Sequence, residues 1–127
     1  MSVIFIDTKF VERSHTLQAQ QFGGAREIRD HGALASAMDR PRNKSSFGES
    51  DVPSLAAAYL FGLTMNCPFV EGNRRIAFIT AIVFLELNGF QFTATNAEAY
   101  TFMMMLAAGE IDEDGAVRFL RDFTVPL

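Results

Sequence analysis

The chain has 127 residues, which suffices for one domain with a substantial core but not for two of ordinary size, so residues 1–127 are expected to form a single domain. Hydrophobic residues make up 49% of it and the net charge is −4, which disfavours a general nucleic-acid-binding or acidic-membrane-binding surface. The single cysteine excludes an internal disulfide.

The N-terminal part of the chain predicts a strand followed by two helices. Its opening segment has too short an apolar run and no leading basic residues for a secretory signal, which predicts a cytoplasmic location. Residues 3–6 ("VIFI") indicate a short strand, and Asp7 offers a cap for a helix that stops near Gly23. A second helix is expected from about Asp30 to just before Pro41, because the residue preceding a proline is pushed away from helical angles.

The middle of the chain predicts a loop and two strongly apolar helices. Residues 42–51 are polar and rich in turn formers apart from Phe47, which indicates a surface loop. Helices are expected over 53–66 and about 74–87, both apolar nearly all round, so this pair should form the centre of the fold. The apolar run of the second is about a dozen residues, short of the roughly 20 that a membrane span needs.

The last third of the chain predicts a short extended piece and two further helices. Residues 90–94 ("FQFTA") are typical of extended chain, Thr95 or Asn96 should cap a helix to Ala108, and Asp112 should cap a last helix through Phe123. The fold is therefore expected to be all-α, a compact bundle of about six helices with one short N-terminal strand.

One turn gathers residues that suit a phosphate site. In "NCPFVEGNRR" (66–75), a helix that begins at Asn73 would point unpaired N–H groups and positive potential out of the turn. Gly72 would let a ligand approach the backbone, Arg74 and Arg75 would bind phosphate oxygens, and Glu71 is explained if a magnesium ion lies between it and the phosphates.

Simpler interpretations of the same residues remain open. Arg74 and Arg75 fit solvated side chains at a helix start, Glu71 fits their salt-bridge partner, and Asn73 fits a cap. Phe69 is expected to be a core residue that fixes the turn, and Cys67 taken alone is typical of a small buried hydrophobe.

The motif "CPFVEGNRR" resembles the His-x-Phe-x-Asp/Glu-Gly/Ala-Asn-Gly/Lys-Arg signature of the Fic/Doc superfamily. The segments "HTLQAQQFGGAREIRDHGALASAMDRPR", "LAAAYLFGLTMN", "FLELNGF" and "AAGEIDED" are similar to the Doc (death-on-curing) toxin branch, so the resemblance covers nearly the whole chain. It implies a Fic-fold helical bundle in which Glu71 holds magnesium, Asn73 orients the phosphates and supports catalysis, and Gly72 and Arg75 contact the nucleotide.

The resemblance also bears on the reaction. Adenylyl-transferring Fic enzymes usually have Gly where this chain has Arg74 and a second Arg where it has Phe78, whereas the Doc branch has a bulky cation and no second Arg. The residues present therefore favour transfer of the terminal phosphate of ATP to a hydroxyl over transfer of AMP. In the Doc branch the target is elongation factor Tu, and its modification stops translation.

Cys67 departs from the signature, which has the general-base His at this position. A thiol has a pKa of about 8.5, so few molecules carry a thiolate at pH 7, and the expected loss is on the order of 10²- to 10⁴-fold. Three explanations remain open: a natural member with slowed or lost chemistry, an inactivating change from His, or a modified reaction. The alternative functions are an inactive module that binds nucleotide or an antitoxin, and an AMP transferase (adenylyltransferase) of the Fic type.

The resemblance implies two protein partners. No inhibitory Ser/Thr-x-x-x-Glu-Gly/Asn segment occurs in the chain, so a separate antitoxin is expected. Phe47 lies where the family places a flap that docks the target. The run "MMM" at 103–105 spans about 200° of a helix, so it fits either an exposed antitoxin-binding surface or extra core contacts.

Overall fold

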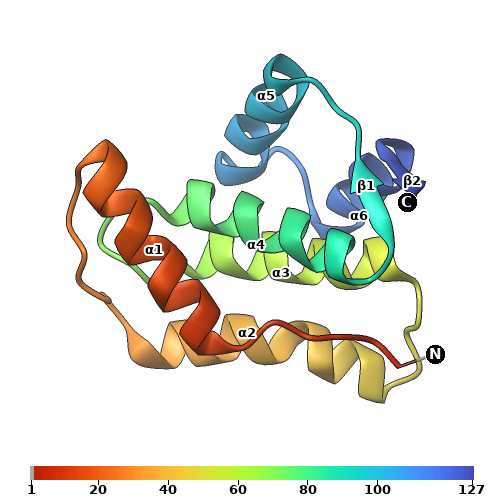
Figure 1. The fold of residues 1–127 in the computed structure, drawn as a ribbon, viewed down its shortest axis with the longest axis horizontal. Coiled ribbons are helices and arrows are strands. Elements are labelled where there is room, and N and C mark those ends of the chain that lie inside the picture. The colour runs from red at the N-terminus through yellow and green to blue at the C-terminus, as the bar shows by residue number, and fades with distance from the viewer. Residues whose placement is uncertain (1) are drawn as a thin grey trace.

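The computed structural model describes residues 2–127 and has six helices and two short strands (Figure 1). The elements are α1 (Thr8–Phe22), α2 (His31–Ser46), α3 (Val52–Asn66), α4 (Asn73–Leu87), β1 (Phe90–Phe92), α5 (Asn96–Ala107), α6 (Glu113–Asp122) and β2 (Thr124–Pro126). The all-α prediction is confirmed. No helix within residues 2–127 combines the length and the apolar character that crossing a membrane requires.

Helix α3 is the centre of the fold. It is buried on nearly every side and packs against α2, α4 and α6 (Figure 1). Its expected partner α4 is buried on one face only, and Phe78 and Ile82 on the other face are half-buried. The central pair is therefore confirmed, but only α3 is fully surrounded. The partly open face of α4 leaves room for a cavity.

The predicted strand at residues 3–6 is wrong. This segment lies along the core and satisfies its backbone through side chains instead of a neighbouring strand. Ile4 donates its N–H to Asn88 Oδ1 (2.8 Å) and accepts from Asn88 Nδ2 (2.9 Å). Ile6 donates to the hydroxyl of the buried Tyr59 (2.9 Å), which donates back to the Ile6 carbonyl (3.2 Å).

The predicted end of the second helix before Pro41 is also wrong, because α2 continues through Pro41 to Ser46. A proline inside a helix removes one backbone hydrogen bond. Here the ring is buried, and α2 packs along α3, so tertiary packing outweighs the local penalty. The surface loop is correspondingly shorter than the predicted 42–51.

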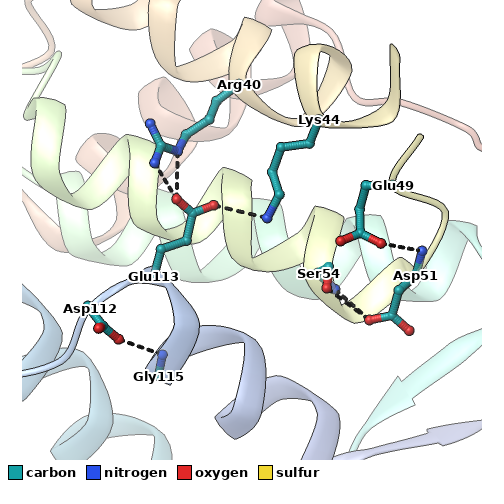
Figure 2. Close-up of polar contacts among 8 residues, drawn as sticks. All are labelled: Arg40, Lys44, Glu49, Asp51, Ser54, Asp112, Glu113 and Gly115. Atoms are coloured by element: carbon teal, nitrogen blue, oxygen red, sulfur yellow. Dashed lines mark hydrogen bonds and ion pairs between the residues drawn. The ribbon is translucent and has the colours of Figure 1, made fainter. Parts of the chain in front are cut away.

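Charged residues tie the far end of α2 to α6. Glu113, in the first turn of α6, accepts from Arg40 Nε (3.1 Å) and from Lys44 Nζ (3.2 Å), both on α2 (Figure 2). Nearby, Asp51 caps α3 through the N–H of Ser54 (3.1 Å) and also accepts from Arg121 Nη2 on α6 (2.7 Å). These contacts hold the helical extension beyond Pro41 against the C-terminal helix.

Acid is expected to weaken this connection. Burial raises the pKa of Glu113, but hydrogen bonds from Arg40 and Lys44 outweigh it and leave the pKa below its ordinary value. The pKa of Asp51 is lowered too, because bonds from Arg121 and Ser54 outweigh its burial. A carboxyl with a lowered folded pKa stabilises fully above its unfolded pKa, and this contribution is lost as pH falls through the folded value.

We therefore expect the free energy of unfolding to fall between about pH 5 and pH 3. Urea denaturation across this range checks it, with Glu113→Gln as the comparison. The variant should start less stable at pH 7 and lose less stability on acidification than the parent chain. Equal acid sensitivity of the two chains would contradict the role given to Glu113.

The remaining predicted elements are found close to their expected places. Residues 90–92 form β1, which pairs antiparallel with β2 in the register Phe90↔Pro126, and β2 itself was not predicted. Thr95 rather than Asn96 caps α5, and Asp112 caps α6 as expected.

Candidate functional site

The loop from Cys67 to Gly72 joins α3 to α4 and is braced by the chain that follows α1. Ile28 forms an antiparallel bridge with Phe69, and Arg29 donates its backbone N–H to Pro68 O (2.7 Å). The Arg29 side chain donates to the carbonyls of Asn66 (2.9 Å) and Cys67 (2.8 Å). The sequence analysis missed Arg29, since nothing in the local pattern says that it reaches a loop 38 residues away.

The N-terminus of α4 is open, unlike those of the other five helices within residues 2–127. Those five are capped by the side chains of Asp7, Asp30, Asp51, Thr95 and Asp112. Helix α4 begins after Gly72, at φ 83°, with no side-chain cap. An uncapped N-terminus keeps unpaired N–H groups and the positive end of the helix dipole available to an anion.

Asn73 closes the loop on itself. Its Oδ1 accepts from the N–H of Phe69 and its Nδ2 donates to the Phe69 carbonyl, both at 2.9 Å. The Asn73 side chain therefore does not cap α4, contrary to the simpler interpretation. The Asn73 side chain fixes the turn and does not occupy the first N–H groups of α4. Phe69 is 1% exposed, which confirms it as the core residue of the turn.

His15, on α1, packs against the same turn and hydrogen-bonds to it. Its ring stacks on Phe69 (3.8 Å between centroids), and its Nε2 lies 2.7 Å from the carbonyl oxygen of Glu71. A Cβ at Gly72 would meet the imidazole at 3.4 Å, and the positive φ of this residue also favours glycine. His15 is thus a buried packing and hydrogen-bonding residue of the turn.

Arg74 and Arg75 project from the first turn of α4 into a cavity of about 580 Å³ between α1, α4 and α5. The Arg75 guanidinium lies over the ring of Phe22 (4.3 Å to the centroid), and Arg74 contacts Met104. Neither forms an ion pair within residues 2–127. Both cations therefore face the cavity without a carboxylate partner.

Glu71 is not the salt-bridge partner of these arginines. One of its carboxylate oxygens accepts a long hydrogen bond from Ala25 N (3.4 Å) across the cavity, and it would lie 2.6 Å from a Cβ at Gly24. Within residues 2–127 no three His, Cys, Asp or Glu side chains gather for a metal ion. A magnesium ion at Glu71 would need its other ligands from phosphate and water, which is how magnesium commonly binds.

Cys67 opens the loop between α3 and α4. It ends α3 in a left-handed conformation (φ 46°, ψ 57°), and it is exposed, so the interpretation of a buried thiol is wrong. Its Sγ donates to the carbonyl of Thr64 (3.2 Å), back toward its own helix. It does not line the cavity that holds Arg74 and Arg75.

Comparison with known proteins agrees with this geometry. A model of the Fic/DOC family matches residues 5–85. The chain belongs to the Fic/DOC family. It is also 38% identical over 92 residues to the Toxin Doc of Mycolicibacterium smegmatis, an overlap that covers 68% of this chain and 70% of the relative. The Fic/Doc resemblance, including its Doc branch, is thereby confirmed.

The Fic/DOC match ends before α5, so the far wall of the cavity is outside it. On that wall Met103 is buried and Met104 is 40% exposed, whereas Met105, which does not line the cavity, is 39% exposed. The prediction that the three methionines cannot all face the core is confirmed. Phe47, at the end of α2, is 92% exposed and far from the turn in sequence. Among the described residues its ring pairs with no other aromatic ring, and it lines the same surface pocket as Lys44 and Glu113.

Proposed function

We propose that this chain is a Doc-like toxin that binds ATP with magnesium and transfers the terminal phosphate to a hydroxyl of elongation factor Tu. The observation that carries the proposal is the open N-terminus of α4, with Gly72 at its start and Arg74 and Arg75 unpaired in the adjoining cavity. Phosphates are stabilised at such a site by the helix N–H groups and by the arginine side chains.

Each residue of the turn has a part in this proposal. Arg75, whose guanidinium lies over the Phe22 ring, would bind phosphate oxygens, and Arg74 would add a second positive charge. Asn73 would keep the loop closed through Phe69 and so hold the helix start in place. Glu71 would hold magnesium, which when bound supplies positive charge beside the phosphates.

Transfer of the terminal phosphate is preferred to transfer of AMP because of the residues on α4. The bulky Arg74 stands where adenylyl-transferring relatives usually have Gly, and Phe78, which lines the cavity, stands where they usually have a second Arg. An apolar ring at residue 78 offers nothing to a further phosphate.

Catalysis is proposed to be slow because of Cys67. A general base must reach the proton that it removes, yet the thiol donates to Thr64 O, back toward its own helix. The same observation favours the second candidate, an inactive Fic-fold module that binds nucleotide or a cognate antitoxin and acts by sequestering it.

A cognate antitoxin would be bound on α5. Tyr100 is 67% exposed and stands with Met104 at the rim of the cavity, and Met105 continues this apolar surface. Flexible methionine side chains adapt to an amphipathic helix. A segment bound here would also cover the entrance to the nucleotide site.

The proposal is tested with Cys67→His, elongation factor Tu and ATP labelled at either the terminal or the α-phosphate. Label from the terminal position alone supports the kinase, and label from the α-position would show AMP transfer. Binding of ATP without any transfer by either chain would favour the sequestering module. Absence of ATP binding would contradict the kinase and the nucleotide-binding module, and would leave only a module that binds the antitoxin.

A further inference from the structure

Gln18 is a buried side chain whose polar atoms have no partner. It is 9% exposed, and neither its Oε1 nor its Nε2 forms a hydrogen bond within residues 2–127. An unpaired buried polar group destabilises the folded state, because it loses its hydrogen bonds to water and gains none in return. The hydroxyls of Thr64 and Thr80 are also unpaired, but they do not line the cavity, whereas Gln18 does. A ligand in the cavity could therefore supply the hydrogen bonds that this amide lacks.

Gln18 stands between the two contacts that α1 makes with the site. On a helix, residues three and four apart share a face, so His15, Gln18 and Phe22 form one row. His15 bonds to the Glu71 carbonyl, and Phe22 lies under the Arg75 guanidinium. The amide is thus held beside the arginine-bearing turn by a rigid element.

The chemistry of a carboxamide selects among ligand groups. A phosphate would accept from Nε2 but would leave Oε1 unpaired beside an anion. A nucleobase edge carries a donor next to an acceptor and satisfies both atoms, as the pairing of glutamine with adenine does. Phe22 and Tyr100, 59% and 67% exposed, line the same cavity and offer faces for a planar ring.

We propose that Gln18 binds the hydrogen-bonding edge of the nucleobase of the nucleotide whose phosphates occupy the α4 N-terminus. This inference rests on the proposed nucleotide binding and adds to it the residue that recognises the base. Gln18 lines the cavity, and the soft terminal torsion of a glutamine lets its Oε1 and Nε2 exchange places to match the donor and acceptor of the base. The fold tolerates the unpaired amide because a bound base satisfies it.

The test compares ATP with inorganic tripolyphosphate, each with magnesium, by calorimetric titration of the full chain. Gln18→Met keeps the length of the side chain and removes both hydrogen-bonding atoms. We expect it to weaken ATP binding roughly 10-fold, the effect of about two neutral hydrogen bonds, and to leave tripolyphosphate binding unchanged. We also expect its melting temperature without ligand to rise, because an unpaired buried amide is removed.

The matched control is Gln21→Met, an exposed position on the same helix, which should change neither affinity. Unchanged ATP affinity in Gln18→Met would overturn the inference, and so would an equal loss for ATP and tripolyphosphate, which would indicate damage to the turn. If the parent chain binds tripolyphosphate but not ATP, base recognition fails while the phosphate site stands. If it binds neither, the proposed function fails.

Discussion

Replacing Cys67 by His should raise the rate of terminal-phosphate transfer to elongation factor Tu by about 10²- to 10⁴-fold, the usual contribution of a positioned general base. An imidazole titrates near neutral pH, whereas a thiol is mostly protonated there. The transfer rate of the variant should rise with pH through the pKa of the new imidazole, because only its neutral form accepts a proton. Single-turnover incorporation of label between pH 5.5 and 8.5 measures both effects.

The backbone at residue 67 permits this change. The left-handed conformation (φ 46°) is uncommon for residues other than glycine, but Asn, Asp and His adopt it several times more often than average. The side chain is exposed, so a ring meets no core packing. Cys67→His should therefore fold at least as stably as the parent chain.

Cys67→Asn is the matched control for the rate. It suits the same backbone conformation but offers no base, so it should fold normally and transfer phosphate no faster than the parent chain. If the His and Asn variants were equally slow while both bound ATP, residue 67 would not limit the reaction, and the sequestering module would be the better account.

Much of the fold could be predicted because the signals are local. Aspartates before helices, glycines after them and apolar periodicity placed α1, α3, α4, α5 and α6 within a few residues of their ends. The errors lie where distant contacts decide. Nothing near Ile4 indicates that Asn88 takes the place of a strand partner, and nothing near Pro41 indicates that packing on α3 keeps α2 helical.

In the candidate site too, the features set by neighbouring residues could be predicted and those set by distant contacts could not. The helix start at Asn73 and its glycine follow from a few consecutive residues and were predicted. Other features of the site depend on which residues the fold brings together. They are the hydrogen bonds between Asn73 and Phe69, the hydrogen bond from Arg29 to Cys67, and the burial of the unpaired Gln18 amide. The sequence alone therefore gives no role to Arg29 or Gln18, although both contribute to the site in the fold.

Replacing Arg75 by Ala should weaken ATP binding by roughly 10- to 150-fold, since hydrogen bonds to a charged group are worth about 1.5–3 kcal/mol. The side chain is exposed, has no carboxylate partner within residues 2–127, and rests on Phe22. Its loss should therefore leave the melting temperature of the ligand-free chain almost unchanged. Calorimetric titration and thermal unfolding separate these two effects.

Arg75→Lys and Arg74→Ala sharpen the interpretation. Lysine keeps the charge but not the planar fork, so it should recover only part of the affinity, and its binding should depend more on salt. Arg74 already donates to the Met104 sulfur on α5, which leaves fewer of its N–H groups free for phosphate. Arg74→Ala should therefore weaken ATP binding less than Arg75→Ala does. If Arg75→Ala bound ATP as tightly as the parent chain, the two arginines would be solvated side chains at a helix start, and the open end of α4 would not be a phosphate site.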